Sequence, residues 1–172
     1  MNKKLEKQAQ ETLSKIRTLT RHIKNVEDSC LLLGEKLILN GEIELGKNLI
    51  ANGFIHDASK WRGIEWDSLI NLVPDDDKKI TKLKLRLAIN HHQKNNFHHI
   101  EYWGDIHKMP DVYLAEFCVD SKARSEEFGS DLRKWIEESA TKRWNFNKND
   151  EVYKKIMRFI DMLCDKTFEK II

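Results

Sequence analysis

One stretch of the sequence decides which fold to expect: Asn52-Gly53-Phe54-Ile55-His56-Asp57-Ala58-Ser59-Lys60-Trp61. It contains an adjacent pair, His56 and Asp57. Imidazole and carboxylate groups are the ligand types that hold divalent metals at catalytic sites. An adjacent pair can supply two ligands to one site, and its carboxylate can bridge two ions. A His-Asp dipeptide arises often by chance, so its meaning depends on which other histidines and aspartates the chain carries.

Further residues of the same two types stand in a defined order around this pair. One histidine, His22, precedes it, and a dense cluster with one later aspartate follows it: His91, His92, His98, His99 and Asp120. An ordered set of this kind is far more specific than the dipeptide alone. The sequence therefore predicts a metal site assembled from several segments that are distant along the chain.

This ordered set resembles the HD-domain superfamily, an all-helical fold of metal-dependent phosphohydrolases, over residues 22 to 127. Lys60, three residues after the aspartate, is similar to the branch with two-metal centres, which includes HD-GYP phosphodiesterases and HD-fold di-iron oxygenases. The stretch His92-x-x-x-Asn96-x-His98-His99-x-Glu101-Tyr102-Trp103 also resembles a small subfamily of HD-like bacterial and phage proteins. The GYP signature is absent, so the resemblance does not imply hydrolysis of cyclic dinucleotides.

The resemblance also implies a set of metal ligands. One divalent ion would be bound by residues from separate segments: His22, His56, Asp57 and Asp120. Asp57 would also face a second ion, held by His92 and by His98 or His99. The gap between His92 and His98 is shorter than in most HD proteins, so the site is expected to hold one or two ions. Manganese, iron, magnesium, zinc, cobalt and nickel are all candidates.

The function implied by the resemblance is hydrolysis of a nucleotide or related small phosphate ester through metal-activated water. Asp57 and Lys60 would be the catalytic residues, with Lys60 holding a phosphate oxygen or the attacking water. Lys122 and Arg124 flank Asp120 and are further candidates for binding the phosphate. Two alternatives stay open: an HD-fold di-iron oxygenase, and a non-catalytic interaction module that the metal stabilises.

Several of these residues also have plainer explanations. His22 lies on the apolar face of a predicted helix, where a histidine can simply be hydrogen-bonded in the core. Asp120 could form a buried pair with Arg124, four residues later. His91 could be an outer partner of the metal ligands, and His107 is expected to be an ordinary surface histidine.

Apolar residues three or four positions apart predict an all-α bundle, and the resemblance implies that this bundle is HD-domain-like with the metal site at its centre. The expected helices cover residues 5–26, 27–39, 42–51, 111–128, 131–140 and 152–171, and a fourth helix in chain order runs from the turn at 74–77 to Lys94-Asn95-Asn96, which ends it. The apolar positions Leu5, Leu13, Ile80, Leu83 and Leu87 are expected to face inward. An acidic turn at 74–77 should begin the fourth helix.

The sequence also predicts the structure of the segments that connect these helices. Asn52-Gly53 should break the chain before His56 and Asp57, so that the pair begins a short new helix. A long aromatic loop is expected over 97–110 and a polar link over 145–149. Ser130 is expected to cap the helix that follows it.

Composition limits the protein class. The 172 residues should form one domain, 1–172, and only two prolines and seven glycines argue for long helices. A net charge of +2 gives no strong nucleic-acid signal. The N-terminus has no signal-peptide pattern and no apolar stretch reaches membrane-spanning length, so a cytoplasmic protein without membrane contact is expected, and a homo-oligomer is compatible. Three well-separated cysteines, Cys30, Cys118 and Cys164, are expected to be small buried hydrophobes.

Overall fold

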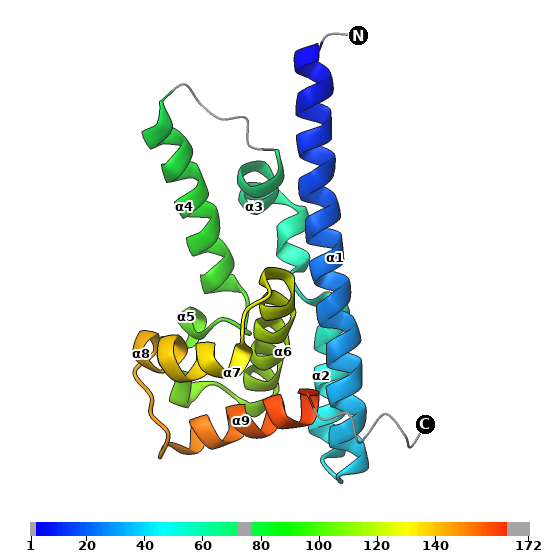
Figure 1. Cartoon of the computed structure of the whole chain (residues 1–172), viewed down its shortest axis with the longest axis vertical. Helices are drawn as coiled ribbons and strands as arrows, with labels where there is room; N and C mark the ends of the chain where they lie inside the picture. The colour runs from blue at the N-terminus through cyan, green and yellow to red at the C-terminus, as the bar shows by residue number, and fades with distance from the viewer. Residues whose placement is uncertain (1–2, 72–76, 165–172) are drawn as a thin grey trace.

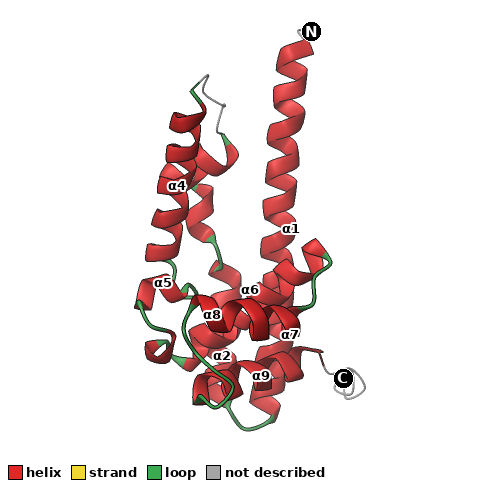
Figure 2. Cartoon of the chain, turned by 60° about the vertical axis from the view of Figure 1, so that its left-hand side comes forward, coloured by secondary structure: helices red, strands yellow, loops and turns green. Residues whose placement is uncertain are grey.

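The computed structural model describes residues 3–71 and 77–164, which form helices and no strand (Figure 2). The predicted all-α bundle is therefore confirmed. The helical elements in chain order are α1 (Lys3–Leu39), α2 (Ile43–Ile55), η1 (Ala58–Trp61), α3 (Gly63–Glu65), η2 (Trp66–Ile70), α4 (Lys78–Asn95), α5 (Ile100–Trp103), η3 (Ile106–Lys108), α6 (Asp111–Phe128), α7 (Leu132–Trp135), η4 (Ile136–Ala140), α8 (Thr141–Arg143) and α9 (Glu151–Cys164). None of the described helices is both long and apolar enough to span a membrane.

The longest element is α1, which runs the height of the molecule (Figure 1). The prediction of two helices, 5–26 and 27–39, was wrong, because residues 20–33 contain no glycine or proline that would interrupt the backbone hydrogen bonds. The helix ends at Leu39, and Gly41 then turns the chain with a φ of 87° in the left-handed region, so that the Glu42 amide donates to the carbonyl of Leu37 at 2.9 Å.

The second helix, α2, packs closely along α1 and extends past Asn52-Gly53 to Ile55. The predicted break at this dipeptide was therefore wrong. A Cβ atom on Gly53 would lie 2.6 Å from the Cβ of Cys30, and one on Gly46 would lie 2.4 Å from the carbonyl oxygen of Gly34. These glycines allow two helix backbones to approach each other, which is a different use of glycine from the turn that the sequence suggested.

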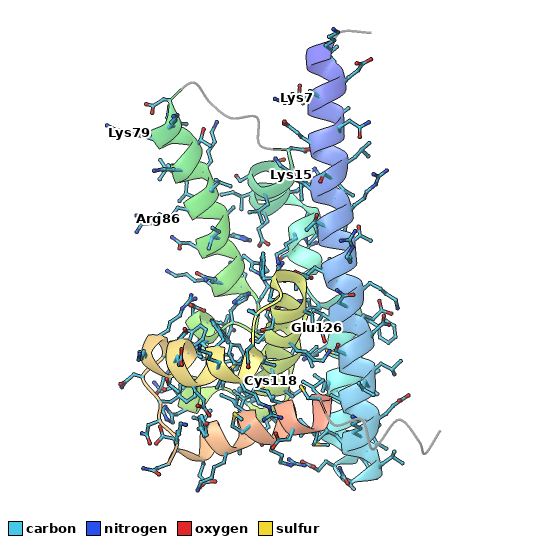
Figure 3. The ribbon with its side chains drawn as sticks, viewed as in Figure 1. Lys7, Lys15, Lys79, Arg86, Cys118 and Glu126 are labelled. Carbon is cyan, nitrogen blue, oxygen red and sulfur yellow. The ribbon has the colours of Figure 1, made fainter. Side chains whose placement is uncertain are left out.

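The core forms where α6 lies between α1, α2 and α9 (Figure 1). Leu33 and Leu37 of α1 are fully buried there, as are Leu49 of α2 and Ile156 of α9. Cys118 of α6, which is labelled in Figure 3, is buried in the same core. The prediction for Cys30 and Cys118 is confirmed, whereas Cys164, at the end of α9, is exposed.

The first half of α1 and most of α4 extend beyond this core (Figure 1). Lys79 and Arg86 point away from α4 (Figure 3), and α4 buries only Ala88 and His92. The expectation that the apolar residues of these two segments face the core was wrong, since five of them are 41–60% exposed: Leu5, Leu13, Ile80, Leu83 and Leu87. Periodicity correctly indicated that both segments are helical, but it could not show that no other element among the described residues covers their apolar faces.

The connections also differ in part from the expectation. The segment 97–110 is not a continuous loop, because it contains the short helices α5 and η3. Asp131 caps α7 by accepting a hydrogen bond from the Lys134 amide at 3.0 Å, so Ser130 is not the cap, and the helical segment runs on through α8. Asp77 caps α4, as expected of the acidic turn, while residues 74–76 and the expected end of the last helix at 165–171 lie outside the described residues.

Candidate metal centre

The central feature of the site is the sharp change of chain direction at His56 and Asp57. Helix α2 ends at Ile55, and Asp57 adopts a left-handed conformation with φ of 57°. Aspartate tolerates this region better than most residues. The pair therefore lies between α2 and η1 rather than at the start of a new helix. Both side chains point into the interior, where His56 is 3% exposed and Asp57 is 1% exposed.

Two groups of potential ligands meet around this turn. The first group combines α1, the end of α2 and α6: His22, His56 and Asp120. The second group comes from α4 and the segment after it: His92, His98 and His99. Within each group the potential ligand atoms lie within 4.8 Å of one another. The structure thus brings together the histidines and aspartates that the sequence singled out as ligands, and these clusters could hold a metal ion.

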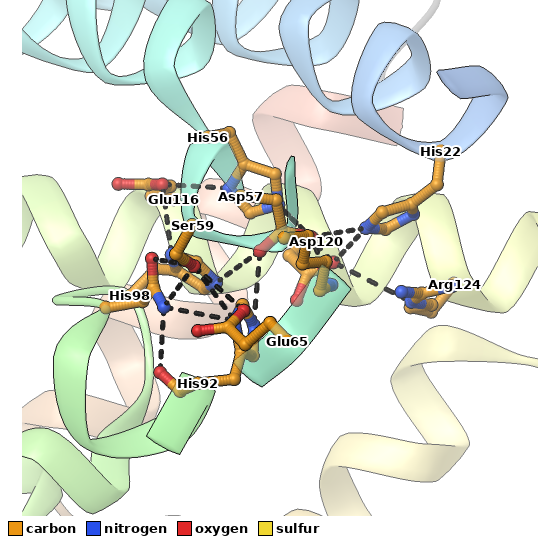
Figure 4. A network of polar contacts seen from close by, with 12 residues as sticks. His22, His56, Asp57, Ser59, Glu65, His92, His98, Glu116, Asp120 and Arg124 are labelled. Atoms are coloured by element: carbon orange, nitrogen blue, oxygen red, sulfur yellow. Dashed lines mark hydrogen bonds and ion pairs between the residues drawn. The ribbon is translucent and has the colours of Figure 1, made fainter. Parts of the chain in front are cut away.

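The Asp57 carboxylate lies between the two groups (Figure 4). Its Oδ2 atom is 3.6 Å from Nε2 of His22 and 3.5 Å from Nε2 of His56. Its Oδ1 atom is 3.1 Å from Nε2 of His92 and 3.6 Å from Nε2 of His98. Since each oxygen faces a different group, this carboxylate is placed to bridge two ions.

Buried glutamates hold the far sides of the histidine rings. The Oε1 atom of Glu116 lies 2.9 Å from Nδ1 of His56 and 3.2 Å from Nδ1 of His98. One carboxylate therefore orients a histidine from each group. The Asn52 side chain in turn donates to the second oxygen of Glu116 at 2.9 Å.

The same arrangement recurs at two more rings. Nδ1 of His22 lies 2.9 Å from Glu127, and Nδ1 of His92 lies 2.8 Å from Glu65. Glu65 is fully buried and also accepts a hydrogen bond from the hydroxyl of Ser59 at 2.9 Å. A carboxylate behind each ring fixes its orientation and raises its basicity as a ligand.

The tautomers follow from these contacts. An ionised carboxylate can only accept, so each of these rings carries a proton on Nδ1, and in its neutral form it presents the lone pair of Nε2 to the centre. Several inward-facing atoms are buried without any hydrogen-bond partner: Nε2 of His22, His56, His98 and His99, and Oδ1 of Asp57 and Asp120. Burying unpartnered polar atoms is unfavourable, and divalent cations bound at the two groups would satisfy them. The donor set therefore fits a metal.

The carboxylates of the centre stay ionised. Burial opposes the charge on Glu116, but hydrogen bonds from His56 and His98 lower its pKa to about 2. Burial also opposes the charge on Asp57, yet the neighbouring His56 and Lys60 hold its pKa well below the usual range. Negative charge is thus concentrated in the interior, which favours a cation there.

The surroundings of His99 and Asp120 also shift the pKa values of these two candidate ligands. Burial, assisted by the neighbouring His98 and His92, lowers the pKa of His99 to about 3, so this ring is neutral at pH 7 and free to act as a ligand. The pKa of Asp120 is lowered as well: burial opposes its charge, but the neighbouring imidazoles of His22 and His56 outweigh that effect.

The structure distinguishes His91 from His92 and shows which residue lies nearest to Asp120. Of the adjacent pair on α4, His92 is buried at the centre, while His91 is 48% exposed and contacts the outer oxygen of Glu65 at 2.8 Å. Asp120 is closer to His22, at 3.1 Å, than to Arg124, at 4.0 Å.

Two other basic or titratable candidates lie away from the centre. Lys122 pairs with Glu126 at 2.6 Å and lines none of the three cavities described around the centre, so the structure does not place it with the other phosphate-binding candidates. His107 is a surface histidine, as expected, and pairs with Asp105.

Sequence reasoning missed the glutamates behind the rings. A signal existed for Glu116, because it interrupts the apolar run Leu114–Val119, and a buried carboxylate needs partners. Glu127 lies seven residues after Asp120, about two turns along the same face of α6. No comparable signal marks Glu65, which follows Ile64 and precedes Trp66 in an irregular segment.

Two cavities reach the centre from different sides. The α1–α4 cavity, of about 510 Å³, lies between these two helices, with Leu19, Ile70 and Ile89 in its walls and Lys60 near the centre. The α6–α7 cavity, of about 310 Å³, lies on the other side of Arg124 and is bordered by α5, α6, α7 and α8. A smaller cavity of about 240 Å³ lies behind Glu116. The first two have volumes suited to a small molecule.

A conservative change at Glu116 should weaken metal binding. Glu116→Gln keeps the shape of the side chain but replaces the charged acceptor behind His56 and His98 with a neutral amide. Loss of such a contact typically lowers metal affinity about 10- to 100-fold. Competition with a chromophoric chelator would measure this. Glu126→Gln, on the exposed face of the same helix, is the matched control, and equal affinities for the two variants would contradict the orienting role of Glu116.

Comparison with known proteins gives a family but no activity. The model of a family described as "Family of unknown function (DUF5662)" matches residues 11–166, which include every residue of the candidate centre. No curated protein and no solved structure is similar enough to the chain to give a match.

Proposed function

The chain belongs to the family of unknown function DUF5662, and we propose that it is a metal-dependent phosphohydrolase that acts on a nucleotide or related small phosphate ester. The observation that carries this proposal is the convergence at Asp57. Four histidine Nε2 atoms lie within 3.6 Å of its carboxylate, beside a cavity large enough for a small substrate. The ordered ligand motif, which resembles that of HD-domain phosphohydrolases, supports the same activity.

The residues that would hold the metal follow from the two groups. His22, His56, Asp57 and Asp120 would bind one ion, and Asp57, His92, His98 and His99 would bind a second. Imidazole-rich donor sets suit iron, nickel or zinc better than magnesium or manganese. A bound divalent ion would lower the pKa of water and offset negative charge on a phosphoryl group.

The chain's own residues would position the substrate. The Lys60 ammonium contacts Oδ2 of Asp57 and lines the α1–α4 cavity, so it can hold a phosphate oxygen at the edge of the centre. Arg124 lines both cavities, although it also donates to Glu127 at 2.9 Å. The apolar walls formed by Leu19, Ile70 and Ile89 would limit access of bulk water.

The direct test is an assay of the purified protein, loaded with each candidate metal in turn, against a panel of nucleotides and other phosphate esters. Release of phosphate or nucleoside that depends on the metal would support the proposal. Oxygen consumption by the iron-loaded protein without phosphate release would favour an oxygenase instead. If no compound of the panel is hydrolysed and folding depends on the metal, the result would favour an interaction module.

Lys60→Ala should separate substrate binding from metal binding. The variant is expected to retain its metal, because the histidines and Asp57 remain, but to lose about 10²- to 10³-fold in turnover, since it lacks a charge that stabilises the transition state. Metal content and steady-state kinetics measure the two effects. Lys94→Ala removes an equal charge from the exposed end of α4 and serves as the control. Wild-type kinetics in Lys60→Ala would reject the assigned role.

A further inference from the structure

The α6–α7 cavity is not explained by metal binding alone. It shares His99, Asp120 and Arg124 with the α1–α4 cavity, so both spaces border the candidate metal centre. A molecule in the α6–α7 cavity could therefore place one end at the centre while the rest lies between α6 and α7. The chemistry of the walls indicates what that remainder should be.

One wall of the cavity is aromatic. The ring centroids of Phe117 and Trp144 lie 5.5 Å apart, and those of Trp135 and Trp144 lie 6.0 Å apart. Phe128, which also lines the cavity, is 77% exposed. Clustered aromatic side chains of this kind bind flat rings well, because stacking on a nucleobase contributes about 1–3 kcal/mol and tolerates any base.

The polar groups of the cavity favour a ring with hydrogen-bond donors. Oε1 of Glu101 accepts hydrogen bonds from Arg143 at 2.8 Å and from Trp144 at 3.4 Å. Its Oε2 atom is buried without a hydrogen-bond partner, and at 4.0 Å it is too far from Nδ1 of His99 for a hydrogen bond. An N–H group of a ligand would satisfy this oxygen after a small side-chain movement.

The charges in the same wall balance each other. The Arg143 guanidinium is paired with Glu101 and lies over the ring of Trp144, with 4.5 Å from its central carbon to the centroid. This part of the cavity therefore offers little attraction to a second phosphate. It suits a neutral heterocycle instead.

We propose that the α6–α7 cavity binds the base of a nucleotide, with an N–H group of the base donating to Glu101 and the ring lying against Trp144. Placing the nucleotide's phosphate at the metal centre rests on the proposed function, whereas binding of the base does not. The substrate class is accordingly a nucleotide rather than an alkyl or sugar phosphate.

The test uses phosphate-free nucleosides, so it does not depend on hydrolysis. Guanosine, adenosine, cytidine and uridine are titrated into the purified protein, and binding is followed by ligand-observed NMR. At least one of them should bind in the millimolar range or tighter, and ribose 5-phosphate, which lacks a base, should not displace it.

Two variants locate the bound nucleoside. Ser125 lines the cavity and is buried, so Ser125→Leu should fill the space and weaken binding at least tenfold. Ser139→Leu makes the same change at an exposed position outside the cavity and should have no effect. If Ser125→Leu does not fold, Glu101→Gln serves in its place and should weaken binding several-fold, because a neutral amide is a poorer acceptor than a carboxylate.

The outcomes separate this proposal from the proposed function. Failure of all four nucleosides to bind, or binding that neither cavity variant weakens, would overturn the base site even if the protein hydrolyses a phosphate ester. Nucleoside binding that Ser125→Leu or Glu101→Gln weakens would support the base site even if no hydrolysis is found.

Discussion

Asp57→Asn should abolish most of the hydrolytic activity while leaving the fold intact. The carboxylate faces both groups of histidines, so its replacement by a neutral amide removes the charge that would offset bound metal at both positions. We expect hydrolysis of phosphate esters to fall at least about 10³-fold, which corresponds to about 4 kcal/mol of transition-state stabilisation. Metal affinity should fall as well, but by a smaller factor, because the histidines and Asp120 remain.

Kinetics, elemental analysis and circular dichroism of the same preparation would measure these effects together. Asp67→Asn is a suitable control, since Asp67 is an exposed aspartate on the nearby η2 segment. Helicity should be unchanged in both variants, because the apolar contacts of α1, α2 and α6 are not altered. An Asp57→Asn protein that matches the parent in metal content and in rate would show that this carboxylate is neither a ligand nor a catalytic group.

The sequence predicted the residues of the centre better than it predicted the helices that carry them. His22, His56, Asp57 and Asp120 could be found because metal chemistry restricts the residue types, and their order resembles a known motif. The boundaries of α1 and α2 were less accessible. Glycine is a common turn residue, so Gly53 suggested a break. Its close contact with Cys30 of α1 depends on tertiary packing, which the local sequence does not reveal.

The orienting carboxylates show a second limit of sequence reasoning. Glu65 and Glu116 are each a single acidic residue in a sequence that contains 28 Asp and Glu residues. Their role depends on which histidine Nδ1 atom they meet, and those histidines lie 27 and 60 residues away in sequence. Burial of a charge can be suspected from apolar neighbours, as at Glu116, but its partner becomes apparent only in three dimensions.

Removing the metal should cause a large loss of thermal stability. The candidate ligands come from α1, the end of α2, α4, the segment after α4, and α6, so one bound ion would link elements that are far apart in sequence. At a metal concentration 1,000 times the Kd, binding contributes about 4 kcal/mol. For a chain of this size that corresponds to a melting temperature roughly 8–16 °C higher than that of the chelated protein. Calorimetry before and after chelation, with metal content verified by elemental analysis, would measure the difference.

The loss should be uneven along the chain, which gives the test a structural readout. Helix α4 packs mainly against the short elements α3, η2 and α5, and it buries only Ala88 and His92. Without metal, His92 would not anchor α4 through a ligand bond, so hydrogen exchange should accelerate in α4 more than in α9, whose apolar face lies in the core. Restoring the metal should reverse both changes in the parent, and at the same metal concentration it should reverse them less completely in Asp57→Asn. An unchanged melting curve and uniform exchange after verified chelation would contradict a metal that links these helices, because the core would then hold α4 in place on its own.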